Sequence, residues 1–192
     1  MIRQLMDRVA STGGVIDEVK AVYNGIRMCE EKSIELQDWL TSTEGLQVQP
    51  KNEQWEAYFK VHDELIKGHC DLLLLSQYPS ASPELRRLPS DYDMPARMWR
   101  HGIYSMLETT RHRLPSSLEH MIRFCIYAFR SLTLLHQFVA PWKTLWTEYI
   151  RDLVRYRLDI REEDDDIQDR ETWMGVSQVW CSEAEDLASL QN

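Results

Sequence analysis

The chain has 192 residues, of which 43% are hydrophobic and seven are Trp, enough to bury one substantial core. Its formal net charge of -9 is unlike that of a dedicated nucleic-acid-binding domain, and no segment reaches the roughly 18 apolar residues of a membrane span. The N-terminal stretch MIRQLMDRVASTGG lacks the apolar core of a secretion signal. Four Cys without a CxxC pair favour reduced, mostly buried thiols of an intracellular protein.

The first half of the chain contains two helical patterns and a connection. A heptad of mostly apolar residues predicts one long helix over about residues 14–42, able to pair with a neighbouring helix. The next pattern has helical period from Trp55 to Leu73, with charged residues on the opposite side. Residues 78–95 contain four Pro in eighteen positions, so we expect a connection there, one that packs on the surface or carries a short helical turn.

Four further helices are predicted in the second half. One opens near Pro95 and runs to about Leu114. The segment 117–139 is apolar nearly all round, as an interior helix is. A helix starting at Pro141 and a last one over about residues 167–188 follow. Few Gly and Pro and the absence of any strand pattern predict an all-α protein of antiparallel helices.

The charge is distributed unevenly along the chain. Residues 1–94 hold 10 Lys+Arg against 16 Asp+Glu, a balance of -6. Residues 95–161 hold 11 against 5, a balance of +6, and residues 162–192 hold 1 against 10, a balance of -9. A basic middle between acidic ends is a signal of a binding site for an anion.

The stretch RDLVRYRLDIREEDDD, residues 151–166, concentrates this contrast. Arg151 and Arg155 share the helix face away from the core stripe, while Arg157 flanks the core. On an earlier helix, Arg100 follows the core residue Trp99. Arginines from two helices that meet at a groove can hold a phosphate by bidentate hydrogen bonds, but the same arginines can also line a solvated face. The residues alone leave both interpretations open.

Signals of enzymatic chemistry are absent from the sequence. The chain has no GxGxxG, P-loop, HExxH or GxSxG motif. His62 and His69 are two helical turns apart, and they are interpreted as ordinary core or boundary histidines. The acidic run 162–166 is interpreted as a solvated loop rather than a magnesium site. We therefore expect no enzyme, no metal and no cofactor.

Several motifs together resemble a known family. The stretches are PARMWRHGIYSMLETTRHRLPSSLEHM, RDLVRYR and DDDIQDRETWMGVSQVW. They resemble the ever-shorter-telomeres type DNA/RNA-binding family, which includes telomerase-associated subunits and SMG adaptors of nonsense-mediated mRNA decay. EVKAVYNGIRMCEEKSIEL, NEQWEAY and SQYPSASPELRRL resemble one branch of it. The similarity covers about residues 15–180, and the ordered set of motifs is more specific than any one of them.

The resemblance implies a fold and a set of site residues. It implies a 14-3-3-like bundle of antiparallel helices over residues 1–163, leading into tetratricopeptide-like hairpins. It also implies that Arg100, Arg155 and Tyr156 grip a phosphoserine of a partner protein. Arg100 stands where relatives carry Lys, which keeps the charge. Arg151 stands where relatives have a small Gly, which changes the local helix packing.

The end of the chain departs from the family pattern. Residues 164–192 resemble an acidic loop and the first helix of a tetratricopeptide-like hairpin, and the sequence then stops at SEAEDLASLQN. We expect this helix to lack its hairpin partner, which would leave Trp173 and Trp180 exposed and prone to association.

The sequence is therefore compatible with three functions. The first is a non-enzymatic adaptor for phosphorylated partners in mRNA-decay or telomere complexes, in the nucleus, the cytoplasm or both, with no membrane partner. The second is direct binding of single-stranded DNA or RNA by the segment 95–161, with aromatic rings for stacking. The third is a structural fragment that self-associates through the 15–40 heptad. The basic residues proposed to contact nucleic acid are Arg97, Arg111, Arg151 and Arg157.

Overall fold

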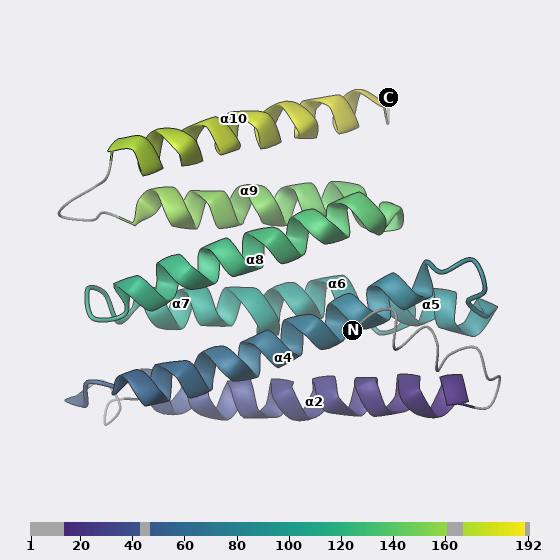
Figure 1. The fold of residues 1–192 in the computed structure, drawn as a ribbon, viewed down its shortest axis with the longest axis horizontal. Coiled ribbons are helices and arrows are strands. Elements are labelled where there is room, and N and C mark those ends of the chain that lie inside the picture. Colours follow the sequence, from purple (N-terminus) through teal and green to yellow (C-terminus); the bar gives the residue numbers. More distant parts are fainter. Residues whose placement is uncertain (1–13, 43–46, 161–166, 191–192) are drawn as a thin grey trace. The chain divides into compact units, whose positions relative to one another are not determined.

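The computed structural model describes residues 14–42, 47–160 and 167–190, and its regular elements there are all helices (Figure 1). The expected all-α class is confirmed for the described part of the chain. The chain consists of two compact units, Met1–Met106 and Leu107–Asn192, and the boundary between them falls within helix α7 (Ser105–Arg111). The boundary expected near residue 163, between a bundle and a tetratricopeptide-like helix, stays a prediction.

The heptad of the first unit forms α2 (Gly14–Thr41), which packs along α4 (Asn52–Ser76). Ile26, Ser33 and Leu40 from the heptad are buried, as a paired helix requires. The two helices approach closely at Gly68, where an added Cβ would lie 2.8 Å from Cγ1 of Ile26. The heptad therefore finds its partner inside the same unit.

The proline-rich segment 78–95 contains more structure than a connection. A nine-residue helix, α5 (Pro83–Asp91), lies within it, and the hydroxyl of Ser82 accepts the N–H of Leu85 at its start. A serine cap followed by Pro in the first turn is a strong helix start. Because Leu85 and Pro89 are buried, the helix is held by packing as well as by its cap.

The next helix begins as α6 (Met94–Arg97) and ends with α7, close to the predicted range. Between them, Met98–Tyr104 forms a π-helix, η1, which the sequence did not predict. Its Gly102 packs against α4, where an added Cβ would lie 3.2 Å from Cγ1 of Ile66. A π-helix has i→i+5 hydrogen bonds and is rare outside single turns within α-helices.

A buried histidine connects the π-helix with the two long helices of this unit. Nδ1 of His62 lies 2.8 Å from the carbonyl oxygen of Gly102, and Nε2 lies 3.2 Å from the hydroxyl of Ser33. His62 on α4 therefore joins α2 and η1 through one neutral ring. Two helical turns further along α4, His69 is also buried, and its Nδ1 donates to the carbonyl of Leu65, 2.8 Å away. Both are core histidines, as the sequence indicated.

Acid should destabilise this unit through the two histidines. Burial lowers the pKa of His62 and of His69 from 6.5 to about 4. Between pH 4 and 6.5 the unfolded chain therefore binds more protons than the folded one. The free energy of unfolding should thus fall by a few kcal/mol as the pH drops from about 7 to 4.5. Urea unfolding at several pH values measures this. A His62→Gln variant should be less stable at pH 7 but show a shallower pH dependence, and an unchanged slope would contradict the assignment.

The second unit contains α8 (Leu118–Phe138), the 3-10 turn η2 (Ala140–Trp142) and α9 (Lys143–Asp159). Met121, Phe124 and Leu132 of α8 are buried, but Ile126, Leu134 and Phe138 are 37%, 39% and 56% exposed. The expectation that this helix is interior on all sides is therefore wrong. An apolar helix is interior only where neighbours cover its whole circumference, and part of α8 faces solvent.

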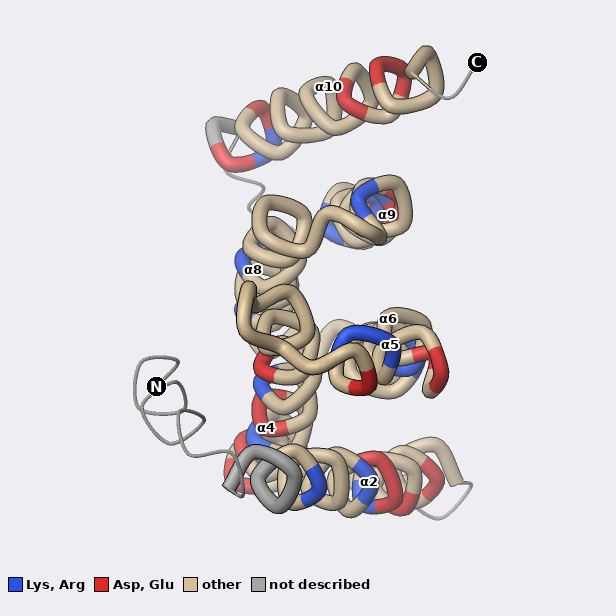
Figure 2. The backbone as a smooth tube through the Cα atoms, turned by 90° about the vertical axis from the view of Figure 1, so that its right-hand side faces the viewer, with Lys and Arg blue, Asp and Glu red and all other residues tan. Residues whose placement is uncertain are grey.

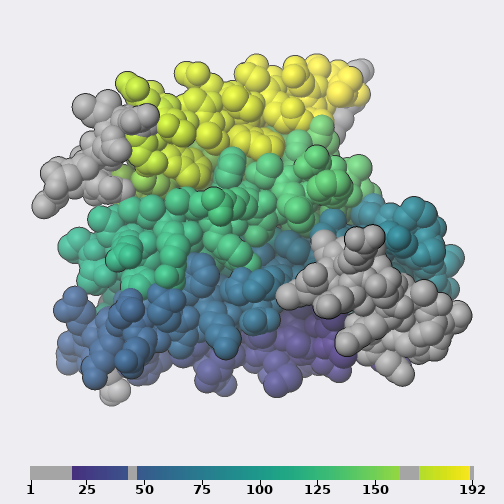
Figure 3. Space-filling model, in the orientation of Figure 1, coloured from purple at the N-terminus to yellow at the C-terminus, as the bar shows by residue number. Residues whose placement is uncertain are grey.

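The last helix, α10 (Ile167–Leu190), packs on α9 (Figure 1). Trp173 is only 8% exposed and meets the ring of Phe129 edge to face, with centroids 5.4 Å apart. Trp180, which is half buried, packs at 6.4 Å on the same Phe129 and at 4.9 Å on His136. Figure 3 shows the yellow side chains of α10 packed against the green helices beside it. The expectation that both Trp side chains are exposed is wrong, because α8 supplies an aromatic partner.

Polar contacts also fasten α10 to the unit. The carboxylate of Glu183 lies 2.9 Å from Nζ of Lys143 and 3.4 Å from Nε2 of His136. Lys143 and His136 lower the pKa of the Glu183 carboxyl, with the hydrogen bond from Lys143 as the largest cause. The docked helix therefore combines an apolar contact with a charged one.

Truncation of the buried indole should cost stability. Trp173→Ala should lower the free energy of unfolding by about 3 kcal/mol, because it removes a large buried ring. Val179→Ala on the same helix should change it by less than about 0.5 kcal/mol, since Val179 is 65% exposed. Denaturant unfolding measures both variants, and equal effects would show that α10 is not docked through Trp173.

Candidate anion-binding site

Two of the predicted arginines lie on the outer face of α9. Arg151 and Arg155 are exposed, and Figure 2 shows Lys and Arg positions on this helix. The side chain of Arg155 is 69% exposed, and its Nη1 lies 3.4 Å from Oδ1 of Asp152 one turn earlier. Such an exposed pair within a helix contributes little free energy. The guanidinium of Arg155 is accordingly accessible to a ligand.

Tyr156, the neighbour of Arg155 in sequence, reaches α7. Its hydroxyl donates a hydrogen bond to Oε1 of Glu108. The same carboxylate receives both arms of Arg111, with Nε 3.0 Å from Oε1 and Nη2 2.6 Å from Oε2. Nε2 of His112 lies 3.6 Å from Oε2. Arg111, the following His112 and Tyr156 of α9 therefore surround the carboxylate of Glu108 in one cluster within this unit.

The cluster favours a negative charge at its centre. Burial alone would raise the pKa of Glu108, whose side chain is 15% exposed. The hydrogen bonds from Arg111 and Tyr156, with the charges of Arg111 and His112, outweigh burial and hold the pKa below its ordinary value of 4.5. At neutral pH the centre of the cluster is thus an oxyanion bound by a guanidinium fork and a phenol.

Arg157 has a different role from its neighbours. Its side chain is 7% exposed, its Nη2 donates to Oδ2 of Asp169, and its guanidinium lies 6.0 Å from the ring centre of Trp173. The sequence placed Arg157 beside the core, and it is in fact part of the contact between α9 and α10. A buried guanidinium keeps its charge and needs such a partner.

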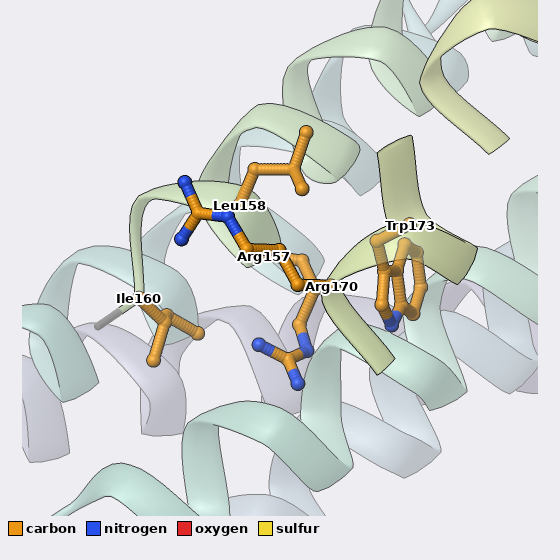
Figure 4. A pocket seen from close by; sticks show the side chains of 5 residues that line it. All are labelled: Arg157, Leu158, Ile160, Arg170 and Trp173. Atoms are coloured by element: carbon orange, nitrogen blue, oxygen red, sulfur yellow. The ribbon is translucent and has the colours of Figure 1, made fainter. Parts of the chain in front are cut away.

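The hollow beside Arg157 is too small for a phosphate. Its volume is about 10 Å³, room for about one water molecule. In Figure 4 the guanidinium groups of Arg157 and Arg170 point in different directions rather than toward one centre. The residues that line it are Arg157, Leu158, Ile160, Arg170 and Trp173.

The remaining predicted residues, Arg97 and Arg100, belong to the first unit. Arg97 binds Glu30 with two arms, Nε to Oε1 at 3.0 Å and Nη2 to Oε2 at 2.6 Å, and its Nη1 lies 3.3 Å from the hydroxyl of Tyr23. Arg100 is an exposed residue of the π-helix. Because Arg100 and Arg155 lie in different units, their joint grip on one phosphate stays a prediction.

Glu108 is the site residue that the sequence analysis missed. Glu108 precedes Arg111 by three residues and His112 by four, which places all three on one helix face. The contacts among these three residues could therefore have been predicted from the sequence. The contact with Tyr156 spans 48 positions and has no local signal.

Other kinds of site find little support in the described residues. Among them, no three His, Cys, Asp or Glu side chains lie close enough together to hold a metal ion. No helix that the structure describes is both long and apolar enough to cross a membrane. The acidic run 162–166, which the sequence analysis weighed as a metal site, lies outside the described residues. A pocket of about 240 Å³ in the first unit has no charged residue in its lining, so it does not suit an anion.

Comparisons of the chain with protein-family models, with curated proteins and with solved structures gave no match. The family resemblance of the motifs therefore stays a prediction.

The contrast between two arginines of α9 gives a test. Arg157→Gln should lower the free energy of unfolding by about 3 kcal/mol, because it removes the buried partner of Asp169 and its contact with Trp173. Arg151→Gln should change it by less than about 0.5 kcal/mol, since Arg151 is exposed. Denaturant unfolding distinguishes the two, and a stable Arg157→Gln protein would mean that Arg157 is available for a ligand after all.

Proposed function

We propose that the chain is a non-enzymatic adaptor that binds a phosphorylated partner protein through Arg155 and Tyr156 of α9. The observations that carry this proposal are the exposed guanidinium of Arg155 and, at the next position in sequence, Tyr156, whose hydroxyl already donates to an oxyanion. A phosphoserine offers charge and three acceptor oxygens to such donors. The resemblance of the motifs to telomerase-associated subunits and mRNA-decay adaptors supports the same proposal.

Arg155 can exchange its present partner for a phosphate at little cost. Its contact with Asp152 is 3.4 Å long and exposed, with 45% of the Asp152 side chain also exposed to solvent. Exposed ion pairs of this kind are worth about 0–1 kcal/mol. Charge-assisted hydrogen bonds to a phosphate are worth about 1.5–3 kcal/mol each, so the exchange favours the ligand.

The arrangement of the other arginines weighs against direct binding of nucleic acid. Of the four residues proposed to contact it, Arg97, Arg111 and Arg157 already hold carboxylates of the chain. Each phosphodiester of a nucleic acid carries one charge, as each of these internal acids does, so it has less advantage over them than a phosphomonoester with about -1.5 to -2 charges. We therefore take the phosphorylated protein as the ligand and use an oligonucleotide as a comparison in the test.

Replacement of Arg155 should weaken phosphopeptide binding. The probe is a peptide library with a central phosphoserine, with the unphosphorylated library beside it, and the best binder is then titrated by fluorescence anisotropy. Arg155→Ala should weaken its binding by roughly ten- to hundredfold, as expected for the loss of one charge-assisted contact. Arg155→Glu should weaken it further, because it also adds repulsion.

Arg130→Glu is the matched control, since Arg130 is an exposed arginine of α8 in the same unit. It should leave the affinity within about twofold if binding depends on the site rather than on net charge. Undiminished binding by a folded Arg155→Glu protein would refute the proposal. Loss of oligonucleotide binding alone, with a reduced salt dependence, would replace it with nucleic-acid binding. A double-mutant cycle of Arg100 and Arg155 tests whether the two share one ligand.

A further inference from the structure

The cluster around Glu108 has the form of an occupied anion site. A bidentate guanidinium and a phenolic hydroxyl are donors that suit a phosphate as well as a carboxylate, and here Arg111 and Tyr156 direct them at one carboxylate. The donors come from two helices, so the arrangement combines a pairing along α7, Arg111 with Glu108, with a tertiary contact from Tyr156 of α9.

The cluster is also open on one side. The side chains of Arg111 and His112 are 51% and 59% exposed, whereas that of Glu108 is only 15% exposed. A ligand approaching from solvent would therefore meet the basic groups first and the carboxylate behind them. The order is the reverse of that in the Arg157–Asp169 pair, where the guanidinium is 7% exposed and the carboxylate is 44% exposed.

We propose that Glu108 is a built-in competitor that occupies the phosphate subsite of Tyr156 and Arg111 until a phosphomonoester displaces it. The inference rests on the proposed function, because it describes what controls binding at Tyr156. It adds Arg111 to the ligand's donors and gives Glu108 a role that its sequence neighbours do not suggest.

Charge gives the phosphomonoester its advantage over the internal carboxylate. A phosphoserine carries about -1.5 to -2 charges at neutral pH, against -1 for Glu108. Its three acceptor oxygens can accept from both arms of Arg111 and from Tyr156 together. The cost of turning the Glu108 carboxylate out to solvent lowers the affinity of every anion, so weakly charged anions are rejected.

Removal of the competing charge should strengthen phosphate binding. In full-length ¹⁵N-labelled protein, inorganic phosphate is titrated while the Nε–H resonances of Arg111 and Arg155 are followed by NMR. Glu108→Gln should bind phosphate about tenfold more tightly than wild type, because the amide keeps the shape without the negative charge. Glu119→Gln removes the same charge from an exposed position of α8 and should change the affinity by less than about twofold.

A second measurement uses the wild type and does not depend on the variant folding. Saturating phosphate should move the Arg111 Nε–H resonance and the ¹³C resonance of the Glu108 carboxyl with one midpoint, as expected when the ligand takes over the donors. Phosphate that moves only the Arg155 resonance, or a Glu108→Gln protein that binds no more tightly than Glu119→Gln, would overturn the inference and leave the proposed function standing. If phosphate moves none of these resonances in either protein and phosphoserine peptides do not bind, both fail.

Discussion

Arginine charges that cannot be lost must be matched wherever the fold buries them. A guanidinium stays protonated under all physiological conditions, so its burial requires an acid beside it. Glu30 forms an ion pair with Arg97 where α2 contacts α6, and Asp169 forms an ion pair with Arg157 where α9 contacts α10. The acidic ends of the chain thus supply partners to its basic middle. Part of the uneven charge along the sequence is a consequence of helix packing rather than a sign of an external ligand.

This pairing changes the meaning of the four arginines in residues 151–161. Arg157 is a structural residue, whereas Arg151 and Arg155 face solvent. The number of basic residues in a segment therefore overstates its capacity to bind an anion. What matters for recognition is which guanidinium groups remain accessible after the helices have docked. Arg155 is accessible, and it precedes in sequence the tyrosine that contacts Glu108.

The sequence predicted the elements that depend on local periodicity. The helices α2, α4, α9 and α10 follow from apolar residues repeated every three or four positions, and α8 follows from its nearly continuous apolar run. The outward position of Arg155 follows from the apolar stripe of α9. Within the proline-rich segment the sequence predicted at most a short helical turn, where the structure has the nine-residue helix α5, and the π-helix has no periodic signal. The burial of Trp173 and the contact of Tyr156 with Glu108 depend on partners far along the chain, which no local pattern encodes.

The close approach of Gly68 to Ile26 and of Gly102 to Ile66 has an evolutionary consequence. An added Cβ at position 68 would lie 2.8 Å from Ile26, so the isoleucine or its helix would have to move, whereas at position 102 it would lie 3.2 Å from Ile66, which would have to give by only a few tenths of an ångström. Chains that descend from a common ancestor and keep this packing should therefore show covariation, in which Ala at position 68 accompanies Val or Ala at position 26. Position 102 has a second restriction, since its carbonyl must still reach the ring of residue 62. Paired substitutions at these sites would trace the ancestry of the fold even where overall identity has been lost.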